Sequence, residues 1–370
     1  MSRGLGDVYK RQVSALTIKA NGQDSLWKIQ TTDYHGTYYG ATVANGGIGI
    51  LPWKEPFSIR HVMLNHVFDS ATPQDVSRVL RGINPFNLQM QINGQTVNGD
   101  NISRWEQCID MKEATHNTHF TCDGKADVSY SICALRNLPY AGLVRVEVVA
   151  LGDMYLTVSN PIEIPDEYKN IGSKLVNVNV NGNDIKIVRT WALSKYREQK
   201  VSASSAFIYD KNSSVQQQYN GSGQISISLK KGEKFFFTLL GAVCTGRDFI
   251  DPYNESDREV IYGAKEGLTR LMDGHRKLWN EMWKGDIVIE GDDEAQRTVR
   301  FALYNLYSNA RKGSRLSIPP FGLSSQGYNG HIFWDTEFWM YPPMLFMNQG
   351  IARTMMDYRT AVSYTHLRAH

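Results

Sequence analysis

The sequence has little excess charge of either sign and no block of basic residues. Its 40 lysine and arginine residues nearly balance 37 aspartate and glutamate residues, which leaves a formal net charge of +3 over 370 residues. Proteins that bind nucleic acid or an anionic membrane concentrate positive charge in patches or tails. We therefore expect neither partner. The sequence also lacks a run of about 18 apolar residues, the length that a membrane-spanning helix needs.

Cysteine is scarce, and its spacing disfavours the common metal motifs. Cys108, Cys122, Cys133 and Cys244 form no CxxC pair and have no histidine cluster beside them, so we expect no zinc site and no other cofactor. The first three cysteines fall in one stretch of expected strands, and two of them could form a disulfide in a secreted protein. Buried free thiols are the interpretation that we prefer.

Aromatic residues and glycine are abundant, with 8 Trp, 19 Tyr and 31 Gly. Sugars present apolar C–H faces that stack on aromatic rings, so this composition suits a carbohydrate site. It suits a large β-rich core equally well, and composition alone leaves both interpretations open.

Residues from about 25 to 245 have the pattern of β-strands. Residues 143–150 and 224–229 alternate apolar and polar side chains, and residues 234–240 are continuously apolar, as in a strand buried on both faces. Turn signals separate such runs; they include Asn45-Gly46, Asn93-Gly94, Asn98-Gly99, Asn181-Gly182 and Asn220-Gly221. This many short strands predicts a large antiparallel β-sandwich.

The pattern changes to helix after residue 255. Residues 256–283 carry an apolar stripe, and a short strand is expected at 286–290. Asp292 and Asp293 then precede a strongly periodic helix, where acidic side chains suit the helix dipole. A further helix is expected from about 336 to 358. The order is a β domain, a helical linker and the opening of an α domain.

Both ends of the chain look foreign to this fold. Residues 1–12 and 362–370 have no periodicity that connects to their neighbours, and they resemble translated adaptor sequence. Two helices cannot bury their apolar faces alone, so we expect the α domain to be truncated. Residues 13–20 fit the remnant of a signal peptide, which would favour a periplasmic or extracellular location over the cytoplasm. A first β-strand explains them as well.

The richest set of functional residue types lies in residues 322–344. A glycine-rich polar loop delivers His331, Trp334, Asp335 and Glu337 to the start of a helix. An indole offers a stacking face and a carboxylate can accept two hydroxyl hydrogen bonds, which together suit a pyranose.

A structural explanation of the same residues is also open. Asp335 or Thr336 could cap the following helix, while Trp334, Phe338 and Trp339 pack in its core.

The run Gly-His-Ile-Phe-Trp-Asp-Thr-Glu at 330–337 is similar to a signature of glycoside hydrolase family 65. That family includes maltose, trehalose and kojibiose phosphorylases and related α-glucoside hydrolases. Residues 286–296 resemble the start of its catalytic domain, and residues 38–50 resemble an early strand of the family more loosely. The resemblance extends over about residues 25–359.

The resemblance implies a β-sandwich at 13–255, a helical linker at 256–285 and the truncated start of an (α/α)6 barrel at 286–361. It implies that Trp334 and Asp335 hold the non-reducing glucose in the −1 subsite. His331, Glu337 and Tyr328 are the other substrate-binding candidates that it suggests on the same loop.

The resemblance also implies an inverting reaction on α-linked glucose disaccharides or oligosaccharides such as kojibiose or maltose. One carboxylic acid protonates the leaving oxygen while a nucleophile attacks the opposite face. The nucleophile is water in the hydrolases and inorganic phosphate, as co-substrate, in the phosphorylases. We expect the general acid beyond residue 361, so we assign no catalytic residue here and predict that this chain is inactive.

Two other classes remain as alternatives. A non-catalytic carbohydrate-binding or structural β-sandwich protein explains the strands and aromatics but gives the loop at Trp334 no role. A polysaccharide lyase also combines a helical toroid with a β-sandwich, but usually places the toroid first. For a family 65 enzyme, a homodimer of the full-length protein is a further expectation.

Overall fold

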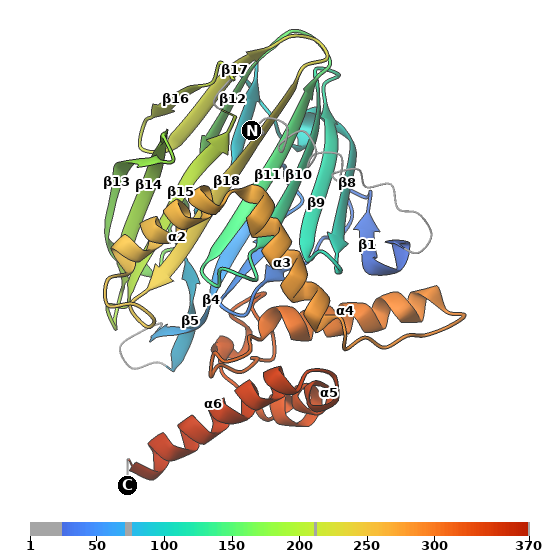
Figure 1. The fold of residues 1–370 in the computed structure, drawn as a ribbon, viewed down its shortest axis with the longest axis vertical. Helices are drawn as coiled ribbons and strands as arrows, with labels where there is room; N and C mark the ends of the chain where they lie inside the picture. Colours follow the sequence, from blue (N-terminus) through green and yellow to red (C-terminus); the bar gives the residue numbers. More distant parts are fainter. Residues whose placement is uncertain (1–23, 71–75, 211–212, 369–370) are drawn as a thin grey trace.

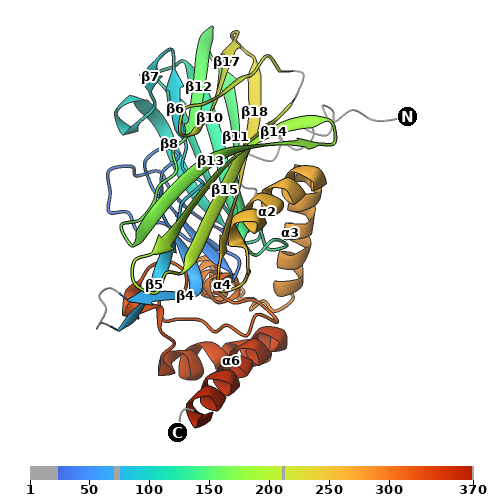
Figure 2. The same ribbon diagram turned by 90° about the vertical axis from the view of Figure 1, so that its left-hand side faces the viewer.

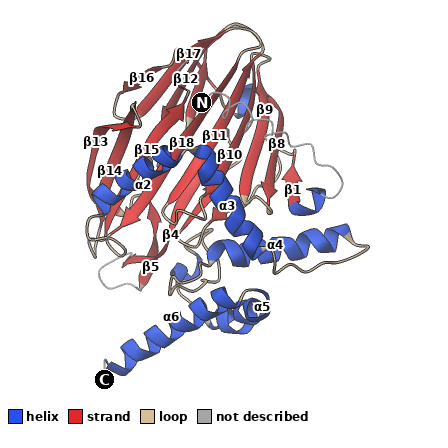
Figure 3. Cartoon of the chain, viewed as in Figure 1, coloured by secondary structure: helices blue, strands red, loops and turns tan. Residues whose placement is uncertain are grey.

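The computed structural model describes residues 24–70, 76–210 and 213–368 of the chain. Strands occupy most of the chain up to residue 245, and helices follow them (Figure 3). Figure 1 shows the strands as a tall sandwich, with α4 (Asp293–Asn309), α5 (Tyr341–Met347) and α6 (Gln349–Arg368) at its lower end. The expected fold class, a large antiparallel β-sandwich followed by helices, is confirmed.

Three antiparallel sheets build the sandwich. The largest has nine strands in the order β1 (Lys28–Thr31), β8 (Ile102–Asp110), β9 (Thr115–Cys122), β10 (Ala126–Ala134), β11 (Ala141–Ala150), β18 (Lys234–Thr245), β15 (Lys200–Tyr209), β14 (Asn183–Ser194) and β13 (Tyr168–Val180). The second has five, β16 (Gln216–Tyr219), β17 (Gly223–Leu229), β12 (Met154–Asn160), β6 (Gln89–Ile92) and β7 (Gln95–Thr96). The third has four, β2 (Val43–Ala44), β3 (Ile48–Pro52), β4 (Ile59–Ser70) and β5 (Ser77–Gly82).

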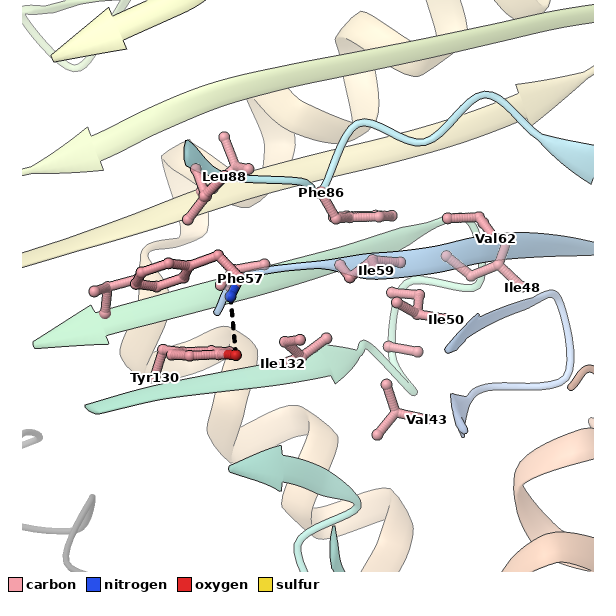
Figure 4. Packing of buried hydrophobic residues seen from close by; sticks show 14 of the residues in the cluster. Val43, Ile48, Ile50, Phe57, Ile59, Val62, Phe86, Leu88, Tyr130 and Ile132 are labelled. Atoms are coloured by element: carbon pink, nitrogen blue, oxygen red, sulfur yellow. Dashed lines mark hydrogen bonds between the residues drawn. The ribbon is translucent and has the colours of Figure 1, made fainter. Parts of the chain in front are cut away.

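One apolar core fills the space between these sheets. In Figure 4, side chains of the four-stranded sheet such as Ile50 and Ile59 lie against Tyr130 and Ile132 of β10. The Tyr130 ring stacks on Phe57 with centroids 4.4 Å apart, and its hydroxyl accepts a hydrogen bond from the Phe57 N–H at 3.0 Å. The tyrosine thus buries its ring and still satisfies its polar end, as buried tyrosines require.

Two helices cover the outer face of the nine-stranded sheet, α2 (Pro252–Glu266) and α3 (Leu268–Met282) (Figure 2). Strand β18 is buried on both of its faces, because Leu239 faces the core between the sheets while Leu240 packs under the helices. This explains the continuous apolar run read from the sequence. The stretch 256–283, expected to be helical, consists of two helices, because Gly267 takes φ 80° and ψ 152° between them.

The strand expected at 286–290 is also wrong. That segment is extended but pairs with no strand of the described chain. Its backbone is satisfied by one side chain instead: Gln296 accepts from the Ile289 N–H at 2.6 Å and donates to the Ile287 carbonyl at 2.9 Å. Helix α4 begins as expected, with the Asp292 carboxylate accepting from the N–H groups of Glu294 and Ala295.

The helix expected from 336 to 358 is broken in the structure. A π-helical turn, η5 (Thr336–Met340), leads into α5, whose first turn holds Pro342 and Pro343, and Asn348 then separates α5 from α6. Asn348 has φ −152° and ψ 84°, which is not helical. The sequence pattern located the helical region but did not show these two interruptions.

The remaining sequence signals were confirmed in part. Asn93-Gly94 and Asn181-Gly182 each form a two-residue hairpin turn with positive φ at both positions, as this turn type demands. All four cysteines are buried and free, which confirms the preferred interpretation. Within the described ranges, no helix is long and apolar enough to cross a bilayer, and no three metal-ligating side chains gather.

Candidate functional site

The loop before η5 lies against the four-stranded sheet. Three hydrogen bonds fix it there: His61 Nε2 to the Ser324 carbonyl, Gln326 Nε2 to the Val79 carbonyl, and His331 Nε2 to the Ser77 carbonyl, each at 2.6 Å. These bonds join residues about 250 positions apart in the sequence. The sandwich therefore serves as the scaffold that positions the loop.

Two glycines allow the loop to approach the sheet closely. A Cβ on Gly49 of β3 would collide with the backbone and side chain of Leu323, and one on Gly330 would collide with the Val79 side chain. Gly330 also has φ +72°, a conformation that disfavours other residues. Loop and sheet are thus closer at Gly49 and Gly330 than a side chain on either residue would allow.

Trp334 and Asp335 lie on the open side of this loop. The Trp334 side chain is 56% exposed and makes an edge contact with Phe338, with ring centroids 5.6 Å apart. In the described structure, the Asp335 side chain forms no capping hydrogen bond with η5. The arrangement leaves an indole face and a carboxylate available to a ligand.

Neither Asp335 nor Thr336 caps the following turn through its side chain in this structure. Thr336 is fully buried, but its hydroxyl donates to the Ile318 carbonyl at 2.7 Å instead of capping η5. Phe338 and Trp339 are each 67% exposed, so they do not form a helix core here. The substrate role of Trp334 and Asp335 stays a prediction.

Glu337 is already engaged by another side chain. Arg359 of α6 donates from Nε to Glu337 Oε1 at 2.6 Å and from a terminal nitrogen to Oε2 at 2.8 Å. This hydrogen bonding raises the pKa of Arg359. Both carboxylate oxygens of Glu337 therefore have a partner within the protein.

His331 and Tyr328 occupy different environments on the loop. The His331 ring stacks on Phe68 with centroids 5.3 Å apart, and its Nε2 is held by the sheet. Tyr328 is exposed, has φ +49°, and its ring contacts Phe321 and Phe333. His331 is therefore placed to support the loop, while Tyr328 lies exposed on its surface.

A polar cavity of about 220 Å³ lies behind the loop. Gln326 lines it together with Arg81 and Glu167, and Gln326 Nε2 also donates to Glu167 Oε1 at 2.6 Å. A second cavity of about 310 Å³ lies at the β1 edge. Neither of these two cavities is lined by Trp334 or Asp335.

Sequence reasoning missed the residues that hold the loop. Arg359 follows Glu337 by 22 positions, and His61 precedes Ser324 by more than 250. Neither spacing has a helical or strand period. Charge complementarity was the only available signal for Arg359, and it does not choose among the 40 basic residues of the chain.

A large β-sandwich followed by helices, with an exposed tryptophan beside a carboxylate, is an arrangement that suits a carbohydrate-active protein. Residues 40–282 match the model of the glycosyl hydrolase family 65 N-terminal domain, and residues 300–365 match that of its central catalytic domain. The chain belongs to glycosyl hydrolase family 65.

Two relatives are kojibiose hydrolases. The chain is 36% identical over 342 residues to that of Flavobacterium johnsoniae, covering 90% of this chain and 50% of the relative. It is 32% identical over 368 residues to that of Mucilaginibacter mallensis, covering 97% of this chain and 54% of the relative. The chain thus spans about half the length of these relatives.

A solved structure has the same fold. It is described as a "putative kojibiose phosphorylase from human microbiome", and it superposes with a TM-score of 0.74 at 14% identity, covering 91% of this chain and 49% of that chain. At this identity the likeness concerns the fold alone.

Proposed function

We propose that this chain carries the glucose-holding surface of an inverting enzyme that hydrolyses α-linked glucose disaccharides, with kojibiose as the first candidate. Trp334 stacks on the apolar face of the non-reducing glucose, and Asp335 accepts hydrogen bonds from two of its hydroxyls. The observation that carries the proposal is the exposed indole beside a carboxylate that caps no helix, on a loop fixed by the sandwich.

The relatives favour water over phosphate as the acceptor. The two kojibiose hydrolases match 90% and 97% of the chain. The nigerose phosphorylase of Lachnoclostridium phytofermentans and the kojibiose phosphorylase of Thermoanaerobacter brockii match 35% and 28%. If phosphate is the acceptor after all, it enters as a co-substrate.

No general acid or base is assigned within the chain. Inversion needs two groups on opposite faces of the scissile bond. Glu337 is unsuited to either role because Arg359 engages both of its oxygens. Asp335 lies beside the stacking indole, where it grips hydroxyls.

Titration of the chain with kojibiose, followed by saturation-transfer NMR, tests this proposal. Maltose serves as a second α-linked ligand, and cellobiose serves as the β-linked control. We expect Trp334→Ala to weaken kojibiose binding on the order of tenfold, since loss of an aromatic contact costs about 0.5–1.5 kcal/mol beyond lost area. Asp335→Asn should weaken it similarly.

Trp339→Ala is the matched control, because Trp339 is an equally large exposed ring on η5, the turn that follows Trp334. It should bind kojibiose as the unmodified chain does. Absence of kojibiose binding, or equal losses in Trp334→Ala and Trp339→Ala, would overturn the proposal.

A further inference from the structure

Arg359 joins helix α6 to both ends of the segment that carries Trp334 and Asp335. Its guanidinium forms the two-pronged contact with Glu337, a geometry that fixes orientation as well as distance. A terminal nitrogen of Arg359 also donates to the Phe333 carbonyl at 3.3 Å. The Arg359 side chain therefore holds Phe333, just before Trp334, and Glu337, two positions after Asp335.

A second contact fixes the same segment from inside the protein. The buried Thr336 hydroxyl donates to the Ile318 carbonyl, and Thr336 begins the π-helical turn η5. Such turns are rare and frequently occur at functional sites. With Thr336 held on the inner side and Glu337 on the outer side, the backbone at Trp334 and Asp335 is constrained, while the Trp334 side chain stays exposed and Asp335 is half-buried.

The contact with Arg359 also gives the carboxylates of Asp335 and Glu337 different environments. Glu337 is paired, with side chains of Arg359 and Glu337 only 33% and 36% exposed. Asp335 has no ion pair among the residues that the structure describes. Pairing of Glu337 therefore leaves Asp335 as the carboxylate that is free to accept hydroxyl hydrogen bonds.

We propose that Arg359 is a positioning residue that orients the Trp334 indole and the Asp335 carboxylate through Glu337 and the Phe333 carbonyl. Arg359 and Glu337 do not touch the sugar, so Glu337 changes from a predicted substrate contact to a partner of Arg359. The identity of the ligand rests on the proposed function. The ordering of Trp334 by Arg359 concerns the free protein and can be measured without any sugar.

The first experiment uses the chain labelled with 5-fluorotryptophan and ¹⁹F NMR. Trp334→Phe identifies the Trp334 resonance by its disappearance. We expect Arg359→Met to shift and broaden this resonance, Glu337→Gln to act in the same direction, and Arg359→Lys to retain part of the native signal.

Arg353→Met is the matched control, since Arg353 is an exposed arginine of the same helix. It should leave the Trp334 resonance unchanged. If Arg359→Met does not fold, Glu337→Gln and Arg359→Lys still decide the matter. An unchanged Trp334 resonance in folded Arg359 and Glu337 variants would overturn the proposal.

The second experiment adds kojibiose to the same proteins. Because Arg359 acts through Trp334 and Asp335, we expect Arg359→Met to weaken kojibiose binding by up to about tenfold, the loss expected when the Trp334 contact is removed. The double variant with Glu337→Gln should be no worse than Arg359→Met alone, because Arg359→Met already removes the contact with Glu337.

The two proposals fail in different ways. If the chain does not bind kojibiose but its Trp334 resonance responds to Arg359→Met, the proposed function fails and the positioning role stands. If kojibiose binds and both readouts ignore Arg359→Met, the positioning role fails and the proposed function stands.

Discussion

Replacement of Thr336 by valine tests the inner fixation of the candidate site. The Thr336 side chain is fully buried, and its hydroxyl donates to the carbonyl of Ile318, a residue that is itself 2% exposed. Valine keeps the shape but removes the donor, so a buried carbonyl loses its partner. Such a loss costs about 1–3 kcal/mol, and we expect Thr336→Val to lower the free energy of unfolding by that amount.

Urea unfolding followed by circular dichroism measures this loss. Thr336→Ser keeps the hydroxyl and removes one methyl group, so its cost should be about 1 kcal/mol and come from packing. Thr360→Val is the matched control, because Thr360 makes a comparable bond to the Met356 carbonyl at an exposed position. It should stay within about 0.5 kcal/mol of the unmodified chain. Equal stabilities of Thr336→Val and Thr360→Val would refute the reasoning.

Three further substitutions test other parts of the structure. Burial raises the pKa of Glu259 from 4.5 to about 7, so the native state holds this proton more tightly and stability falls as pH rises through that interval. Glu259→Gln should match the unmodified chain near pH 4 and exceed its unfolding free energy at pH 8 by on the order of 1–3 kcal/mol; an equal difference at both pH values would contradict this. Gly49→Ala should cost about 1–3 kcal/mol in urea unfolding, because its Cβ would collide with Leu323. A Cβ at Gly94 would meet no atom within 4 Å, but Gly94 has φ +81°, so we expect Gly94→Ala to cost about 1 kcal/mol through backbone strain alone. A larger loss of unfolding free energy in Gly94→Ala than in Gly49→Ala would contradict the collision with Leu323.

The sequence predicted the local features of this fold well, because local features depend on neighbouring residues. The Asn93-Gly94 turn needs positive φ at two positions, and few other residue pairs allow it. Asp292 caps α4 through hydrogen bonds to N–H groups two and three positions ahead. Such contacts leave a signature in the sequence.

The errors arose where a distant or unusual side chain replaced the regular pattern. Residues 286–290 carry three consecutive β-branched residues, as strands often do, yet Gln296 supplies hydrogen bonds that a neighbouring strand would otherwise provide. The helix break at Gly267 is a local signal that was overlooked, because the apolar stripe continues on both sides of it. Periodicity alone therefore overestimates the length of regular elements.

The candidate site shows the same division between local and distant information. Trp334 and Asp335 were identified from their residue types, but their exposure depends on contacts that no local pattern contains. His331 is held by the Ser77 carbonyl of β5, and Glu337 by Arg359 of α6. A substitution in either element would therefore disturb the indole and carboxylate without touching them. It follows that loss of sugar binding in a β5 or α6 variant would not identify the substituted residue as a sugar contact. The ¹⁹F signal of Trp334 in the free protein is needed to distinguish a residue that contacts the sugar from one that positions Trp334.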